Sequence, residues 1–303
     1  MNPLERNVLL DLWFQRSSNS EDDRMKRAER MVRQAIKAHP ALASVRYRVY
    51  PKGSYANQTN VRADSDVDIV VENQEACYYE YIPSSIQPSP DPHHNRYLGP
   101  WTPDAWRTEV TSALTSYFGS QGVDNSGNVA ITVKEVPGSR PSADVVPAFD
   151  FIRYDSPDRS NAHEGSRVFS KGGTPINNFP TQQLTNGQQK DNKTRGRYKR
   201  YVRALKNAEN ALVREGKLAA LPSYFIECLV WNVPNETLLQ GNQYEGFETV
   251  LWYLYDRLDE KNFNAENWEE PNSLKWLFPR NSKWTPQQGQ DLSVVTLAYL
   301  GYV

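Results

Sequence analysis

The sequence predicts an α+β protein, because two hydrophobic patterns divide the chain between them. Short runs that indicate strands lie at 45–50, 67–71, 129–133 and 143–149. Apolar residues recur at helical spacing at 4–14, 20–38 and 103–118, and again in several stretches after residue 194. A chain of 303 residues can bury a sizeable core, and it fits one two-lobed unit or two small domains.

Composition excludes several classes of protein. The net charge of -1 gives no overall attraction to nucleic acid, and a mean hydropathy of -0.73 without a long uncharged apolar run argues against a membrane span. The two cysteines, Cys77 and Cys228, lie far apart, and the four histidines show no zinc-binding spacing. Residues 1–16 contain charges and lack the apolar core of a secretory signal. We therefore expect a cytoplasmic protein without a zinc site.

The remaining elements follow from local signals. The helix over 20–38 is expected to begin with Ser20 as its N-cap and Asp23 at the capping-box position, and Pro40 ends it. The stretch from Pro83 to Pro92 is rich in proline and serine, which indicates a surface loop inserted at the rim. Residues 150–190 are polar and loop-rich, and they predict no regular element.

The most informative stretch is 53–71. Gly53 and Ser54 follow a strand and open a short polar helix, so that bare N–H groups and a hydroxyl are available to phosphate oxygens. Asp66 and Asp68 are two apart at the start of an apolar strand and share one face. Asp-x-Asp alone is common and weak evidence. The joined pattern is specific, and paired carboxylates of this kind suit Mg²⁺ completed by substrate phosphates.

Asp144 is a single acid in the apolar strand at 143–149, after a Pro-Gly-Ser turn at 137–139. Taken alone, it would be a sheet-end residue with solvent access. Beside Asp66 and Asp68 it supplies the third carboxylate that a two-metal phosphoryl-transfer site needs.

A helix expected over about 194–215 places four basic residues at steps of four, four and three along one face: Arg195, Lys199, Arg203 and Lys206. A solvated basic edge is the simplest explanation. Few acids offset these charges, however, and a triphosphate needs cationic partners. We therefore take Arg203 and Lys206 as candidate phosphate ligands.

A further helix begins near Pro222. Ser223 in its first turn could bind an anion, and Tyr224 beside it could stack on a base. The alternatives are an N-cap serine and a core tyrosine. Stretches 244–260 and 285–300 are also expected to be helical, and the candidate core residues near them are Trp252, Tyr253, Trp276 and Leu277.

Together these motifs resemble the bacterial CD-NTases, the cGAS/DncV-like branch of the polymerase-β-like nucleotidyltransferases. The resemblance covers most of the chain, and the residues of the motifs are most similar to those of clade E. The motifs that show it are Lys52-Gly53-Ser54-Tyr55, Ser65-Asp66-Val67-Asp68, Ala143-Asp144-Val145-Val146-Pro147-Ala148, Arg200-Tyr201-Val202-Arg203-Ala204-Leu205-Lys206 and Pro222-Ser223-Tyr224-Phe225-Ile226-Glu227-Cys228-Leu229-Val230-Trp231-Asn232.

The resemblance implies a bilobal fold, with a mixed sheet that holds the acids in residues 1–160 and a helical lobe in 161–303 that closes the nucleotide cleft. The N-terminal helix is expected to pack across both lobes. The implied activity joins ribonucleoside triphosphates, ATP, UTP or others, into a cyclic di- or trinucleotide. That product would activate an effector in anti-phage (CBASS-type) signalling. No membrane partner and no stable nucleic-acid partner are expected.

The resemblance also implies roles for the site residues. Gly53 and Ser54 would hold the donor triphosphate, Asp66 and Asp68 would hold two Mg²⁺ or Mn²⁺ ions, and Asp144 would hold the ion that activates the attacking hydroxyl. Among the helical residues, Lys206 and Ser223 would contact phosphates and Tyr224 would stack on a base. Asn161 is our own candidate for reading a base edge, because its amide can both donate and accept.

Two other functions remain open at this stage. A nucleotidyltransferase that makes linear products on RNA or a small molecule would favour a broader basic surface, which the sequence lacks. A non-catalytic nucleotide- or RNA-binding relative would tend to lose one of the three acids, and this chain keeps all of them.

Overall fold

The computed structural model describes residues 1–16, 18–61, 66–82, 97–280 and 282–303. The chain divides into two compact units. The sheet unit comprises Ser18–Tyr55 and Ala63–Pro180, and the helical unit comprises Met1–Ser17, Ala56–Arg62 and Thr181–Val303. The loop expected at 83–92 lies outside the described residues.

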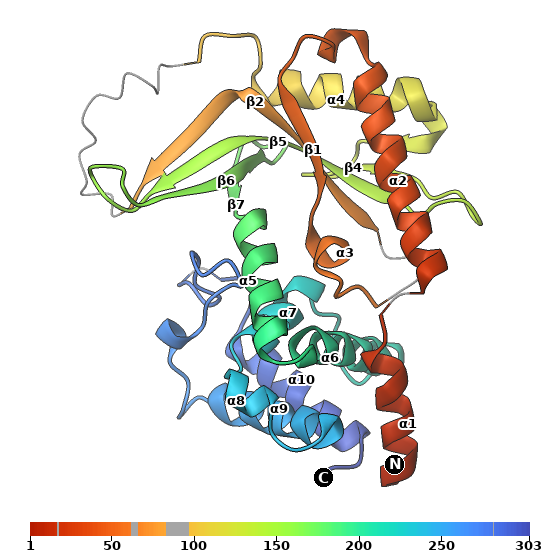
Figure 1. Cartoon of the computed structure of the whole chain (residues 1–303), viewed down its shortest axis with the longest axis vertical. Helices are drawn as coiled ribbons and strands as arrows, with labels where there is room; N and C mark the ends of the chain where they lie inside the picture. Colours follow the sequence, from red (N-terminus) through yellow and green to blue (C-terminus); the bar gives the residue numbers. More distant parts are fainter. Residues whose placement is uncertain (17, 62–65, 83–96, 281) are drawn as a thin grey trace. The chain divides into compact units, whose positions relative to one another are not determined.

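One mixed sheet organises the sheet unit (Figure 1), which confirms the α+β prediction. Its strands are β1 (Tyr47–Pro51), β2 (Val67–Tyr81), β3 (Val123–Asp124), β4 (Ile131–Val133), β5 (Ala143–Tyr154), β6 (Ala162–Phe169) and β7 (Pro175–Asn178). β2 and β5 pair in parallel at the centre, while the other neighbours are antiparallel.

Two helices, α2 (Asn19–Ala38) and α4 (Pro103–Phe118), pack on one face of this sheet and form its main core. Ile69, Val145 and Phe149 point into that core, and the indole N–H of Trp106 donates to the carbonyl of Val71 at 3.1 Å. Side chains alternate along a strand, so residues one position away face the other side. That other face, the open face, has only a small apolar cluster (Val70, Val146, Ala148 and Val168) and can hold polar groups.

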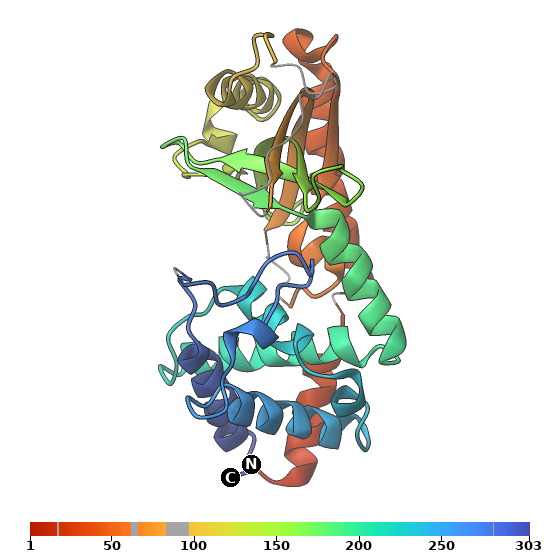
Figure 2. The same cartoon turned by 90° about the vertical axis from the view of Figure 1, so that its left-hand side faces the viewer.

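The helical unit is built around a buried helix, α6 (Arg197–Arg214). The helices around it are α1 (Pro3–Phe14), α5 (Pro180–Lys193), α7 (Ser223–Trp231), α8 (Asn235–Leu238), α9 (Gln243–Arg257) and α10 (Pro286–Tyr299). α9 and α10 lie side by side, and the two chain ends meet (Figure 2), where Arg6 donates to the carbonyl of Leu300 at 3.3 Å. None of the helices in the described ranges is long and apolar enough to cross a membrane.

Three local predictions were wrong. The N-cap of α2 is Ser18, not Ser20, and its capping-box partner is Glu21, because the backbone of Ser18 is extended while residue 20 is already helical. The strand predicted at 67–71 continues to Tyr81. Residues 150–190 contain the end of β5, β6, β7 and most of α5, although they are polar, because strands with one open face do not need continuous apolar sequence.

The expected core residues of the last third were correct only in part. Leu277 is buried and Tyr253 is half-buried, but Trp252 is 40% exposed and Trp276 is 56% exposed. The structure decides against one of the two explanations for the basic face of α6. Arg195 precedes the helix, and the other three residues of that face, Lys199, Arg203 and Lys206, are at most 5% exposed, so a solvated edge is ruled out for them.

Candidate active site

Asp68 and Asp144 lie side by side on the open face of the sheet unit. Each is the second residue of its strand, and the parallel pairing of β2 with β5 places the two directly opposite each other. Asp66 comes just before β2 and is exposed. The three acids that the sequence predicted as one group therefore occupy the same end of two central strands.

Two hydroxyl groups orient these acids. Thr132 on β4, opposite Asp144 in the antiparallel register, donates from Oγ1 to Asp144 Oδ1 at 2.7 Å. The hydroxyl of Ser142 donates to Oδ1 of Asp66. Sequence analysis missed both residues. Extending the register across the β4–β5 hairpin would have found Thr132, because it occupies the middle of the short strand that faces Asp144.

Burial and neighbouring charges both act on the carboxyl of Asp68. Burial raises the pKa of Asp68, the cation of Lys52 opposes that rise, and the carboxylates of Asp144 and Asp66 add to it. Lys52 also donates its backbone N–H to the carbonyl of Asp68 at 2.9 Å. A positive charge placed among these carboxylates would relieve both their repulsion and the cost of burial.

Gly53 is required where α3 (Gly53–Asn57) begins. Its φ of +67° is a conformation that residues with a side chain rarely adopt, and a Cβ there would lie 2.3 Å from Oδ2 of Asp68. The first residue of α3 therefore packs directly against the central acid. Ser54 is the next residue, so its hydroxyl and backbone are tied by sequence to the position of Asp68.

The donor set of this site fits a hard cation, because carboxylate oxygens are the ligands that Mg²⁺ and Mn²⁺ prefer. In the described part of the chain, no three His, Cys, Asp or Glu side chains are gathered closely enough to hold a metal ion. Asp68 and Asp144 are adjacent, whereas Asp66 accepts the hydroxyl of Ser142. A cation shared by all three would therefore compete with Ser142 for Asp66.

The two basic candidates of α6 have partners inside the helical unit. The ammonium of Lys206 donates to the carbonyl of Thr59 at 3.2 Å and lies 3.7 Å from the carboxylate of Glu227. The guanidinium of Arg203 donates twice to the carbonyl of Phe14, at 3.0 and 2.7 Å. Their contacts with phosphate stay predictions.

Ser223 and Tyr224 open α7, as expected. Ser223 is exposed and is not the N-cap, which is Pro222. The hydroxyl of Tyr224 donates to Glu270 at 3.0 Å, and its ring packs against Trp284. These are the contacts expected of a core tyrosine, which was the alternative explanation for Tyr224. Its stacking on a base stays a prediction.

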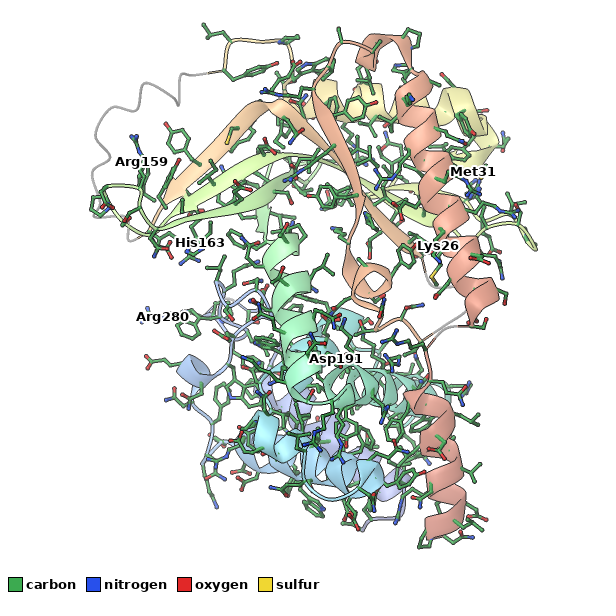
Figure 3. All side chains as sticks on the ribbon, in the orientation of Figure 1. Lys26, Met31, Arg159, His163, Asp191 and Arg280 are labelled. Atoms are coloured by element: carbon green, nitrogen blue, oxygen red, sulfur yellow. The ribbon has the colours of Figure 1, made fainter. Side chains whose placement is uncertain are left out.

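Asn161 lies at the opposite end of the sheet unit from the acids. It is exposed in the turn between β5 and β6, close to Arg159 and His163, which are labelled in Figure 3. The ten steps along β5 from Asp144 to Tyr154 span roughly 33 Å at a rise of about 3.3 Å per residue. The structure therefore does not bring Asn161 to the acids, and its role in base recognition is untested.

The chain is similar to known proteins both in its helical unit and over nearly its full length. The family model described as the cGAS/DncV-like nucleotidyltransferase C-terminal helical domain matches residues 185–301. A cyclic dipyrimidine nucleotide synthase CdnE of Legionella pneumophila is 32% identical, with 95% of each chain covered. A cyclic dipurine nucleotide synthase of Elizabethkingia meningoseptica is 33% identical, with 96% of each covered. The solved structure of the Elizabethkingia meningoseptica CdnE cyclic dinucleotide synthase with GTP and Apcpp aligns with a TM-score of 0.79 at 31% identity, covering 97% of this chain and 98% of that one.

Proposed function

The chain belongs to the cGAS/DncV-like nucleotidyltransferases, and we propose that it joins ribonucleoside triphosphates into a cyclic oligonucleotide at Asp66, Asp68 and Asp144. The observation that supports this most directly is the in-register pairing of Asp68 with Asp144, beside a Gly53 that has no room for a side chain. Such a pair at the start of a phosphate-binding turn suits nucleotidyl transfer.

The site residues of the sheet unit have different roles in this proposal. The carboxylates of Asp66, Asp68 and Asp144 would hold the divalent cations, whose charge would help to activate the attacking ribose hydroxyl and to neutralise the pyrophosphate leaving group. Thr132 fixes the orientation of Asp144 through its hydrogen bond. Ser54 and the backbone beside Gly53 hold the donor triphosphate. Because burial raises the pKa of Asp68, a bound cation would stabilise the charged form of this carboxylate.

The choice of bases is not decided by similarity, because a dipyrimidine synthase and a dipurine synthase are equally close to this chain. We propose UTP and ATP as the first substrates to test. We further propose that the product acts on a separate effector in anti-phage (CBASS-type) signalling. The relatives reported above are both named synthases of cyclic nucleotides, so transfer to an RNA end is not favoured.

The test is incubation of the purified protein with all four ribonucleoside triphosphates and Mg²⁺ or Mn²⁺, followed by phosphatase and mass spectrometry. A phosphatase-resistant cyclic product is expected, and its mass identifies the bases. A linear, phosphatase-sensitive product would contradict the proposal.

The same assay tests the site. The double substitution Asp66→Asn with Asp68→Asn should abolish the product and leave the fold intact, as judged by circular dichroism. Asp158→Asn is the matched control, since Asp158 lies in the β5–β6 turn and bonds only to neighbouring serines in the described contacts. Product at the wild-type rate from the double variant would refute the assignment of the acids.

A further inference from the structure

A buried carboxylate in the helical unit has no place in the proposed chemistry. Glu227 lies in the middle of α7, a helix whose neighbouring residues Phe225, Ile226 and Cys228 form core, and its own exposure is 1%. A lone acid in such a helix is costly unless it is paired and hydrogen-bonded.

The partners of Glu227 gather on one short segment, residues 57–59. Oε1 accepts from the side-chain amide of Asn57 at 2.7 Å, and Oε2 accepts from the hydroxyl of Thr59 at 2.9 Å. Both partners are completely buried. Gln183 on α5 adds a third hydrogen bond at 3.1 Å.

Lys206 binds the same segment from α6. Its ammonium donates to the carbonyl of Thr59 at 3.2 Å and to the hydroxyl of Thr59 at 3.3 Å, and it lies 3.7 Å from Oε2 of Glu227. The cation and the carboxylate therefore neutralise each other, and Thr59 is held by both.

A close approach of α5 fixes the other side of the segment. Gly187 lies so near that a Cβ at its position would be 3.0 Å from Oδ1 of Asn57. Oδ1 itself has no hydrogen-bond partner among the described residues. The amide of Asn57 is therefore held mainly through the bond that it donates to Glu227.

One end of the segment is close in sequence to a residue of the proposed site. Asn57 is the last residue of α3 and follows Ser54 by one helical turn. We propose that Glu227 is a positioning residue, which fixes Ser54 by clamping Asn57 and Thr59 with the help of Lys206. This inference rests on the proposed function, because it takes Ser54 to be a site residue.

An ordinary structural role would not require this arrangement. A hydrophobic side chain of similar volume can often replace a buried ion pair without loss of stability. Glu227, Lys206 and the close approach of Gly187 instead converge on residues 57–59, which follow Ser54 in the chain. Small displacements of a positioning group can cost a large factor in rate.

The experiment measures motion and activity separately. Hydrogen exchange of peptides that cover residues 53–62 is compared for the wild type, Glu227→Gln, Thr59→Val and the double variant. Ser293→Ala is the control, because its buried hydroxyl bonds within α10, to Gly289, and has no other bond among the described residues. Cyclic product formation gives kcat and KM for the same proteins, well below their Tm.

Glu227→Gln and Thr59→Val are each expected to speed exchange in 53–62 at least tenfold and to lower kcat/KM at least tenfold. The double variant should lose no more than the worse single one, because both act through the same contact. Ser293→Ala should behave like the wild type in both measurements.

Unchanged exchange in 53–62, wild-type activity of Glu227→Gln, or additive losses in the double variant would each overturn the proposal. If Glu227→Gln fails to fold, exchange and activity of Thr59→Val, in which the two side chains are nearly isosteric, test the proposal. Absence of cyclic product from the wild type would refute the proposed function, whereas the exchange measurement would still test the clamp.

Discussion

Replacing Gly53 with alanine tests whether the start of α3 positions the central acid. Two penalties are expected. The φ of +67° costs a residue with a side chain about 1–2 kcal/mol. The new Cβ would also lie 2.3 Å from Oδ2 of Asp68, whereas real Cβ atoms essentially never approach closer than 3.0 Å. Either α3 or Asp68 must therefore move by at least about 0.7 Å, the difference between these two distances.

A matched glycine separates the two penalties. Gly138 has a φ of +74° in the turn before β5, and a Cβ there would have nothing within 4 Å. Gly53→Ala and Gly138→Ala should therefore both lose about 1–2 kcal/mol in unfolding free energy, measured by urea. Only Gly53→Ala should also disturb the acids.

Catalysis is expected to distinguish the two variants. A displacement approaching 1 Å in a positioning group can cost about 100-fold, so kcat/KM of Gly53→Ala should fall by about 10- to 100-fold. Gly138→Ala should stay within about twofold of the wild type in the cyclic-product assay. Equal activity of the two variants would refute the claim that Gly53 sets the position of Asp68.

Two further predictions concern the helical unit. Arg203→Lys removes the paired donors to the carbonyl of Phe14, so the free energy of unfolding in urea should fall by about 1–3 kcal/mol, and unchanged stability would contradict a structural role for Arg203. Burial lowers the pKa of Lys190 from 10.5 to about 8, so the folded chain binds fewer protons than the unfolded chain between these values, and stability should rise with pH there. Lys190→Met should flatten that rise in urea titrations from about pH 7.5 to 10.5, whereas an unchanged slope would assign it to another group.

Sequence patterns predicted the α+β fold and the adjacency of two of the acids, but they missed several strands and contacts around them. Asp66, Asp68 and Asp144 could be grouped because a period of two and a hairpin turn are local signals, and the observed register of β2 with β5 confirms the adjacency of Asp68 and Asp144. Thr132 was missed because its importance comes from pairing across strands. Pairing of that kind is not visible in a single run of residues.

The polar stretch at 150–190 shows a second limit. Residues on the open face of a sheet can be polar, so β6 lacks the continuous apolar run that indicates a strand in the sequence. In α6, charged residues that share a face made a solvated edge the simplest explanation, although phosphate contacts were preferred. Lys206 is instead buried, since Glu227 supplies its countercharge from α7. A partner distant in sequence cannot be inferred from helical spacing.

The helical unit is assembled from both ends of the chain, and this has a consequence for synthesis on the ribosome. Phe14 of α1 packs against Tyr201, Tyr244 and Phe247, the first of which is translated 187 residues later. At about 5–20 residues per second, α1 waits roughly 10–40 s for these partners. The sheet unit is complete at Pro180 and can form during that interval, so α1 is translated before the sheet unit but docks after that unit can fold.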